Sequence, residues 1–295
     1  MTVDTTAPAV DDQLSAGGRL FYRRVLRLLD DAGLPFLVGG AYAFERYTGI
    51  ARHTKDLDIF VHPRDFERTL AVLREAGYAT DVPFPHWLGK ARAGDEVVDV
   101  IFSSGNGVAT VDDRWLAHGV ADDVLGVPTR LCPPEEMIWS KAFIMERERY
   151  DGADVAHLVR ACAETLDWPR LLERFGSDHW RVLLSHLLLF GFVYPCERDR
   201  VPPLVVRELL GRLVAELNDE SPREPICQGT LLSRAQYLVD IEGWGYADAR
   251  LAPRGNMTGP ETAAWTAGIV EDGPPEVTGA PGARGRRPEP SREAA

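Results

Sequence analysis

Two acidic residues separated by one position are the first feature of this sequence that could carry chemistry. Asp56 and Asp58 flank Leu57, and apolar residues continue the pattern at Ile59 and Val61. This period of two predicts a β-strand on which both carboxylates share one face, about 7 Å apart. Two such acids repel each other unless a cation lies between them, and Mg²⁺ prefers carboxylate oxygens combined with substrate phosphates. The alternative is a strand end whose acids are exposed at a sheet edge.

A glycine pair precedes these acids. Gly39 and Gly40 follow the apolar segment 35–38 and precede a short helical pattern. Free backbone N–H groups at a helix start, together with the helix dipole, can hold a phosphate group. A simple turn is the alternative for a glycine pair. Arg52 and Lys55 lie just before the acids, so we expect them either to neutralise phosphate or to be surface charges.

A third acid, Asp99, lies in the segment 97–102, whose other residues are all apolar. A charge in such a segment is unfavourable unless it is paired or bound to a metal. We expect the neighbouring strand of the same sheet to place Asp99 beside Asp56 and Asp58. It would act there as a metal ligand, a general base or both. The alternative is an edge-strand acid that faces water.

Together these residues resemble the signature of the DNA polymerase β-like nucleotidyltransferases. In this chain the signature is Gly39-Gly40, then Asp56-Leu57-Asp58, then Asp99. The family often has Gly-Ser at the glycine pair, so a phosphate contact from a serine hydroxyl would be missing here. The resemblance implies an α/β (α+β) fold, in which a small mixed nucleotidyltransferase-type sheet has flanking helices. It also implies a nucleoside triphosphate (NTP) as co-substrate and two Mg²⁺ ions held by the three acids.

A second resemblance lies in the following helical region, after Pro134-Glu135-Glu136. Lys141, Arg149, Asp151 and Asp154 resemble a motif of the abortive-infection Eii-like (AbiEii-like, type IV toxin) branch of that superfamily. The resemblance implies that Lys141 contacts the triphosphate and that Asp151 or Asp154 supports the site. A solvated, salt-bridged helix joint is the alternative, because cations spaced i, i+8 can share one helix face.

Two further groups of residues are candidates for substrate contacts. Trp87 lies on the expected strand beside Asp99, where it would stack on a base or, alternatively, pack in the core. Thr230, Ser233 and Arg234 begin a polar stripe on a helical pattern. This stripe either faces water or closes the cleft over the acceptor.

Composition excludes several other functions. The 295 residues include 45 acids and 33 bases, a formal net charge of −12, which makes extended DNA binding unlikely but allows a local basic pocket. The four cysteines form no close pair, so a zinc ribbon is not supported. The most apolar stretch, 182–194, is shorter than the ~20 residues of a membrane span, and 1–12 has no signal-peptide pattern. We expect a cytoplasmic protein with no membrane partner.

Local patterns predict an α/β half followed by a helical half. Predicted elements are helices at 19–31, 41–47 and 64–76, strands at 35–38 and 56–61, and hairpins within 87–102 and 120–131. The Gly/Pro-rich end cannot bury enough apolar surface to fold, so we expect a disordered tail. The predicted organisation is disorder at 1–14, a nucleotidyltransferase α/β domain at 15–132, a helical domain at 133–252 and a disordered tail at 253–295.

The resemblance implies an Mg²⁺-dependent enzyme that moves a nucleotidyl group (NMP) from an NTP to a hydroxyl acceptor and releases pyrophosphate. The acceptor stays open among a small molecule such as an aminoglycoside, a protein side chain and a tRNA. A catalytically silent nucleotide sensor, or one partner of a toxin–antitoxin pair, is the alternative. The presence of all three carboxylates favours the enzyme.

Overall fold

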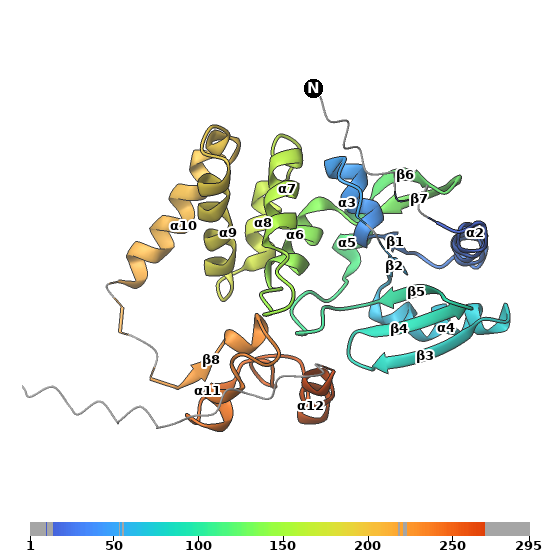
Figure 1. Cartoon of the computed structure of the whole chain (residues 1–295). Helices are drawn as coiled ribbons and strands as arrows, with labels where there is room; N and C mark the ends of the chain where they lie inside the picture. The colour runs from blue at the N-terminus through green and yellow to red at the C-terminus, as the bar shows by residue number, and fades with distance from the viewer. Residues whose placement is uncertain are drawn as a thin grey trace, which may run out of the picture.

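The structure is a computed structural model, and it describes residues 10, 14–52, 54, 56–217, 219–220 and 223–268. A sheet lies beside a layer of helices, and the last part of the described chain passes beneath both (Figure 1). This arrangement is the predicted mixed α/β fold with flanking helices.

The sheet has seven strands in the order β3-β4-β5-β2-β1-β7-β6. It is mixed, because β2–β5 and β1–β7 pair in parallel while the other neighbouring pairs are antiparallel. The strand β3 was not predicted. The strands are β1 Leu37–Val38, β2 Asp56–Phe60, β3 Ala79–Phe84, β4 Leu88–Ala93, β5 Glu96–Ile101, β6 Val120–Val124 and β7 Val127–Leu131.

Helices α2 and α4 pack against each other on one face of the sheet, where α4 contacts β4 and β5 and α2 contacts β5 and β7. The residues between the acids, Leu57 and Ile59 on β2 with Val98 and Val100 on β5, are fully buried. Alternation along each strand therefore turns the acids to the opposite face. Helices of this half are α2 Ala16–Asp31, α3 Gly40–Thr48, α4 Phe66–Glu75, which follows the 3₁₀ turn η1 Pro63–Asp65, and the unpredicted α5 Asp113–His118.

The helical half begins directly after β7. Its helices pack in sequence, α6 against α7 and α8, α7 against α9, and α9 against α10. Helix α7 also packs against α3 and so connects the two halves. These helices are α6 Pro134–Ala142, α7 Gly152–Cys162, α8 Trp168–Phe175, α9 Trp180–Val193 and α10 Pro203–Glu216, with the 3₁₀ turn η2 Arg198–Arg200.

After α10 the chain returns to the sheet as what we call the C-terminal segment, residues 223–268. The side-chain amides of Asn106 and Asn256 hold it there, through bonds of 2.7 Å to the carbonyls of Leu231 and Gly107 respectively. The segment is not purely helical, because it includes a two-stranded sheet. Its elements are β8 Ile226–Cys227, the 3₁₀ turn η3 Gly229–Leu231, α11 Leu238–Glu242, β9 Ala247–Asp248 and α12 Gly259–Ala267.

The helix α12 corrects the predicted start of the disordered tail at residue 253. Thr258 and Glu261 form a capping box at its N-terminus, and this motif satisfies backbone donors that are otherwise unpaired. The Trp265 ring lies 5.2 Å from the Phe84 ring and 5.3 Å from the Trp87 ring. Aromatic packing therefore orders residues that composition alone suggested would be disordered. Residues 269–295, and all of 1–14 except 10 and 14, lie outside the described residues.

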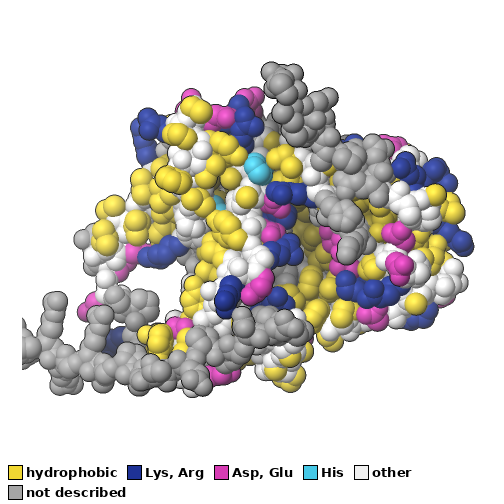
Figure 2. Space-filling view, in the orientation of Figure 1, with side chains coloured by type: hydrophobic (Ala, Val, Ile, Leu, Met, Phe, Trp, Pro, Cys, Tyr) yellow, Lys and Arg dark blue, Asp and Glu magenta, His cyan; other side chains and the backbone are white. Residues whose placement is uncertain are grey.

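Hydrophobic side chains gather on the outer side of α9 and α10 (Figure 2). Phe192 is 81% exposed, Leu217 77% and Leu204 75%. No helix in the described part of the chain is long and apolar enough to cross a membrane.

Candidate functional site

The three predicted acids lie on neighbouring parallel strands. Asp58 on β2 is directly opposite Asp99 on β5, and Asp56 is opposite Val97. Because β2 and β5 run in parallel and in register, Asp56, Asp58 and Asp99 share the face turned away from α2 and α4. The predicted juxtaposition of Asp99 with the acidic pair is therefore present.

The glycine pair fits closely against this strand. Gly40 starts α3 with φ +53°, and a Cβ atom built on it would lie 1.7 Å from Oδ2 of Asp58. A Cβ atom on Gly39 would lie 2.2 Å from the Phe60 ring. The Gly39 amide also donates a 2.9 Å hydrogen bond to the Asp58 carbonyl. Only glycine allows the N-terminus of α3 to approach the carboxylate this closely.

Asp58 carries negative charge that its surroundings do not fully compensate. Burial, followed by the charges of Asp56 and Asp99, raises the pKa of Asp58 to about 7, and Lys141 and Arg149 partly oppose this shift. Such a shift is expected for a carboxyl group that is desolvated and also lies beside like charges. A cation between these acids would remove the repulsion.

Asp99 and Asp56 have nearby partners in the structure. Lys90, the cross-strand neighbour of Asp99, donates to both of its carboxylate oxygens at 2.6 and 2.9 Å. Burial raises the pKa of Asp99, and the bond from Lys90 counteracts this effect. The hydroxyl of Thr54 donates a 2.6 Å hydrogen bond to Asp56. The hairpin predicted within 87–102 contains Lys90, but its ion pair with Asp99 was not predicted.

The predicted basic residues of the helical half form an ion-pair network. The Lys141 ammonium lies 2.9 Å from carboxylate oxygens of both Asp151 and Asp154. Arg149 donates to both oxygens of Asp151 at 2.9 Å, and Arg52 bonds Asp154 at 2.6 Å. The network joins Arg52, from the α/β half, to α6 and the start of α7. The ammonium of Lys141 is thus bonded to two carboxylates. The side chain of Lys141 also lines a cavity. Lys55 lies outside the described residues.

A cavity of ≈ 550 Å³ brings these groups together. This volume is within the usual range for small-molecule sites. Three parts of the chain form its wall. The wall includes Gly40, Asp56, Asp58, Trp87 and Asp99 from the α/β half, Lys141 and Arg149 from the helical half, and Leu231, Arg234 and Trp265 from the C-terminal segment.

Two hard oxygen ligands for Mg²⁺ are available from Asp56 and Asp58. Burial raises the pKa of Asp58, and the charges of Asp56 and Asp99 raise it further. In the described part of the chain, no three His, Cys, Asp or Glu side chains are arranged to enclose a metal ion. Mg²⁺ usually takes only one or two carboxylates and completes its shell with phosphates and water. The pair therefore fits the ion, while a ligand role for Asp99 stays a prediction.

Two aromatic residues, Trp87 and Trp265, line the same cavity as Asp99. Trp87 lies just before β4, and the Phe102 amide donates a 3.1 Å hydrogen bond to its carbonyl. Trp265 meets Trp87 edge to face at a centroid distance of 5.3 Å. The Arg234 guanidinium lies 4.4 Å above the Trp265 ring. Trp265 was missed because it lies in the predicted tail, although the Thr258-x-x-Glu261 pattern of a capping box signals a helix start there.

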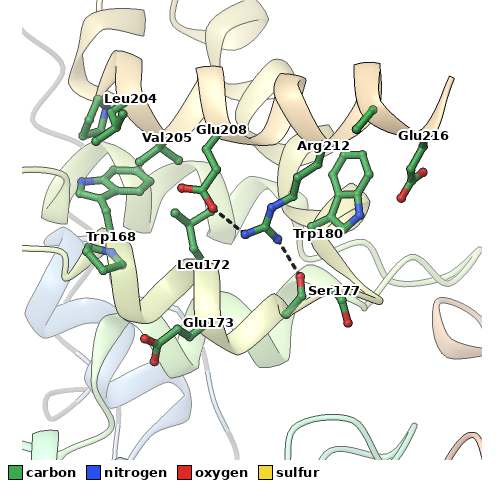
Figure 3. Close-up of a pocket in the computed structure, with 14 residues that line it drawn as sticks. Trp168, Leu172, Glu173, Ser177, Trp180, Leu204, Val205, Glu208, Arg212 and Glu216 are labelled. Carbon is green, nitrogen blue, oxygen red and sulfur yellow. Dashed lines mark hydrogen bonds and ion pairs between the residues drawn. The ribbon is translucent and has the colours of Figure 1, made fainter. Parts of the chain in front are cut away.

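A second, larger cavity of ≈ 910 Å³ lies between α8, α9 and α10 (Figure 3). Trp168 and Leu172 lie opposite Leu204 and Val205, and Trp180 lies beside Arg212 at the other end of the cavity (Figure 3). The acids that line it are paired, Glu173 with Arg114, Glu208 with Arg212 and Glu216 with Arg181. Its acids carry no uncompensated charge, so its size alone does not make it a candidate for chemistry.

Comparison with known proteins identifies one family. Residues 19–190 match the model of a family described as uncharacterised nucleotidyltransferases. The match includes the glycine pair, the three acids and Lys141, but it ends before the C-terminal segment. No curated protein matches the sequence.

Solved structures show distant similarity. The antibiotic-resistance factor ANT(2'')-Ia has 17% identity and a TM-score of 0.41, over 59% of this chain and 98% of that chain. The lincosamide antibiotic adenylyltransferase LnuA has 15% identity and a TM-score of 0.35, over 49% of this chain and 96% of that chain. JHP933 from Helicobacter pylori has 15% identity and a TM-score of 0.35, over 70% of this chain and 100% of that chain. We draw no conclusion about substrate from similarity at this level.

Proposed function

The chain belongs to this family of uncharacterised nucleotidyltransferases, and we propose that it transfers a nucleotidyl group from an NTP to a hydroxyl acceptor. The observation that carries the proposal is the shared cavity wall formed by Asp56, Asp58 and Asp99, with the glycine start of α3 against Asp58. The acceptor oxygen bonds to the α-phosphorus, and the bond from that phosphorus to the β-phosphate oxygen breaks. Pyrophosphate leaves with the bonding electrons.

The proposed roles follow from charge and position. Asp56 and Asp58 would hold Mg²⁺, which when bound supplies Lewis-acid stabilisation of the phosphate charge. The start of α3 at Gly40 would meet phosphate oxygens with its backbone N–H groups. Lys141 and Arg149 lie near enough to Asp58 to lower its pKa, so they would also attract the β- and γ-phosphates. Asp99 would accept the proton of the attacking hydroxyl, with its charge held by Lys90.

We also propose that the chain belongs to the AbiEii-like branch of the superfamily. The supporting observation is that Lys141, Arg149 and Asp154, three residues of that resemblance, line the same cavity as the acids. The ion pairs of Lys141 with Asp151 and Asp154 would also be present in a salt-bridged helix joint, so they do not separate the two interpretations.

A direct experiment is to incubate the full-length protein with Mg²⁺ and each α-labelled NTP in turn, in the presence of a cell extract. The proposal predicts metal-dependent release of pyrophosphate and transfer of label to a component of the extract. Neither pyrophosphate nor labelled product with any of the four NTPs would contradict it.

Silent nucleotide binding is the second candidate, favoured by the ion pair that holds both oxygens of Asp99. This candidate predicts that an NTP raises the melting temperature while no pyrophosphate is released. Measuring thermal stabilisation and pyrophosphate on the same samples separates the two functions.

A further inference from the structure

We propose that the C-terminal segment forms the acceptor site, and that the acceptor is a small hydroxyl compound with a flat ring. We call Trp87, Arg234 and Trp265 the stacking wall. This inference rests on the proposed function, because it assumes that the same cavity binds an NTP.

The direction from which the acceptor oxygen attacks places the acceptor on the side of the stacking wall. In nucleotidyl transfer the acceptor oxygen and the leaving pyrophosphate lie on opposite sides of the α-phosphorus. The phosphate-binding groups, Gly40 on α3 and Lys141 on α6, are on the side where α3 packs against β2 and α7. The acceptor therefore approaches from the other side of Asp58, past Asp99 on β5 and towards β4. Trp87 lies at the start of β4, on that side.

Hydrogen bonds and ring contacts hold the stacking wall in place. Glu146 accepts a 2.9 Å bond from Nε of Arg234 and a 2.6 Å bond from the hydroxyl of Ser233. The guanidinium is therefore held against the Trp265 ring, which in turn packs on Trp87. Preorganised flat surfaces bind rings because little side-chain entropy is lost.

The side chains of the stacking wall are of types that bind flat rings. Indole rings bind other rings by stacking or edge-to-face contact, and a guanidinium plane also stacks on flat groups. Leu231 adds an apolar contact to the same wall. A flat ring that rests on these surfaces shares the cavity with Asp99, the proposed base, to which its hydroxyl group would give up a proton.

The size of the cavity and the net charge of the chain both favour a small acceptor. The cavity of ≈ 550 Å³ must hold the triphosphate as well as the acceptor. The C-terminal segment is tied to both halves, through Asn106 to the Leu231 carbonyl at 2.7 Å and through the Met145 amide to the Leu232 carbonyl at 3.0 Å. A formal charge of −12 also disfavours a polyanion. A small acceptor fits these limits better than RNA.

The test uses the full-length protein with Mg²⁺, α-labelled NTP and three fractions of a cell extract, namely small molecules, RNA and protein. N-acetyltyrosinamide and adenosine serve as defined probes with a flat ring, and methyl glucoside, whose ring is puckered, is the control. We expect label in the small-molecule fraction and faster pyrophosphate release with at least one of the two flat-ring probes but not with methyl glucoside. Label confined to RNA or protein, or no labelled product although the NTP binds, would overturn the proposal.

Variants locate the site. Trp265→Leu should lower kcat/KM for the accepted small molecule about tenfold or more, while the Kd of an α,β-methylene NTP analogue changes less than about twofold. Trp265→Phe should keep most of the activity because it can still stack. Trp244→Leu is the matched control, since Trp244 lies in the same segment but is 43% exposed and does not line the cavity.

If Trp265→Leu lowers the melting temperature, Arg234→Met replaces it with the same expected result. Unchanged acceptor kinetics in these variants, or an equal weakening of the NTP analogue, would overturn the acceptor assignment. Failure of the wild-type protein to bind the NTP analogue would instead contradict the proposed function itself.

Discussion

Two acidic pairs in this protein differ in how their charges are compensated. In the first pair, Glu135 and Glu136 at the start of α6 are 2% and 0% exposed. Arg170 donates to both oxygens of Glu136 at 2.7 Å and also bonds Glu135. Arg174 bonds Glu136 at 2.9 Å. Every carboxylate of this pair therefore has a guanidinium partner that joins α6 to α8.

The second pair, Asp56 and Asp58, has no guanidinium partner in the described part of the chain. Among the described residues no Lys or Arg bonds either carboxylate, and Asp58 has its pKa raised to about 7. Buried charges that only stabilise a fold are normally paired. The difference supports a structural role for the glutamates, which join α6 to α8, and it supports the proposal that the aspartate carboxylates bind a cation.

Asp58→Asn should have the largest effect on activity and should separate the two acidic pairs most clearly. Loss of a metal ligand should reduce nucleotidyl transfer about ten-thousandfold, which is roughly 5 kcal/mol of transition-state stabilisation. The free energy of unfolding should stay the same or rise, because a repulsive charge is removed. Activity and urea denaturation measured on one preparation check both expectations. Asp81→Asn, on the exposed edge strand β3, is the control and should affect neither.

Arg170→Met should have the opposite profile. It leaves Glu135 and Glu136 partly unpaired in the core, which should lower the free energy of unfolding by about 3–5 kcal/mol. Activity per folded molecule should change little at low temperature. Arg160→Met removes an exposed ion pair with Glu197 and should shift the denaturation midpoint far less. Equal stability losses in the two variants would refute the assigned role of Arg170.

Truncation after Arg254 tests whether the C-terminal segment contributes to stability and to the site that contains the aspartate pair. Loss of α12 exposes the aromatic cluster around Trp265, so we expect a loss of about 2 kcal/mol, or roughly 4–8 °C in Tm. Activity should fall as well. Truncation after Gly268 is the control, since the Gly/Pro-rich remainder is expected to contribute little burial. Identical Tm values for both truncations would show that α12 adds no stability.

Lys141→Ala should give the smallest effect, because Lys141 shares features with the surroundings of both acidic pairs. Its ammonium is bonded to Asp151 and Asp154, as in a structural network, yet it lies close enough to lower the pKa of Asp58. We expect a rise in the NTP KM and a fall in kcat, together about tenfold, or 1.4 kcal/mol. Unaltered NTP kinetics would assign Lys141 to the structural network alone.

Local periodicity was enough to predict the acid-bearing strands. The alternation of Leu57 and Ile59 with the acids follows from the geometry of one strand, and Asp99 follows from pairing with a neighbouring strand. Glycine at position 40 was predicted as a phosphate contact, whereas its tight approach to Asp58 depends on how α3 packs.

Contacts between distant residues were not predictable from local patterns. Arg170 is 34 residues from Glu136, and no periodicity links them. Lys90 bonds Asp99 only because β4 and β5 pair in that register. Trp265 was hidden by a composition rich in Gly and Pro, although the capping box at Thr258 was visible. Tertiary packing decided each of these positions.

The central claim is that Asp56 and Asp58 serve the reaction and not the fold. The most direct measurement follows pyrophosphate release from each NTP with Mg²⁺, for the wild-type protein and the double variant Asp56→Asn, Asp58→Asn, with thermal unfolding recorded on the same samples. The account predicts release by the wild type, none by the variant, and an equal or higher Tm for the variant. Release by the variant within tenfold of the wild type, or a Tm as low as that of Arg170→Met, would contradict it.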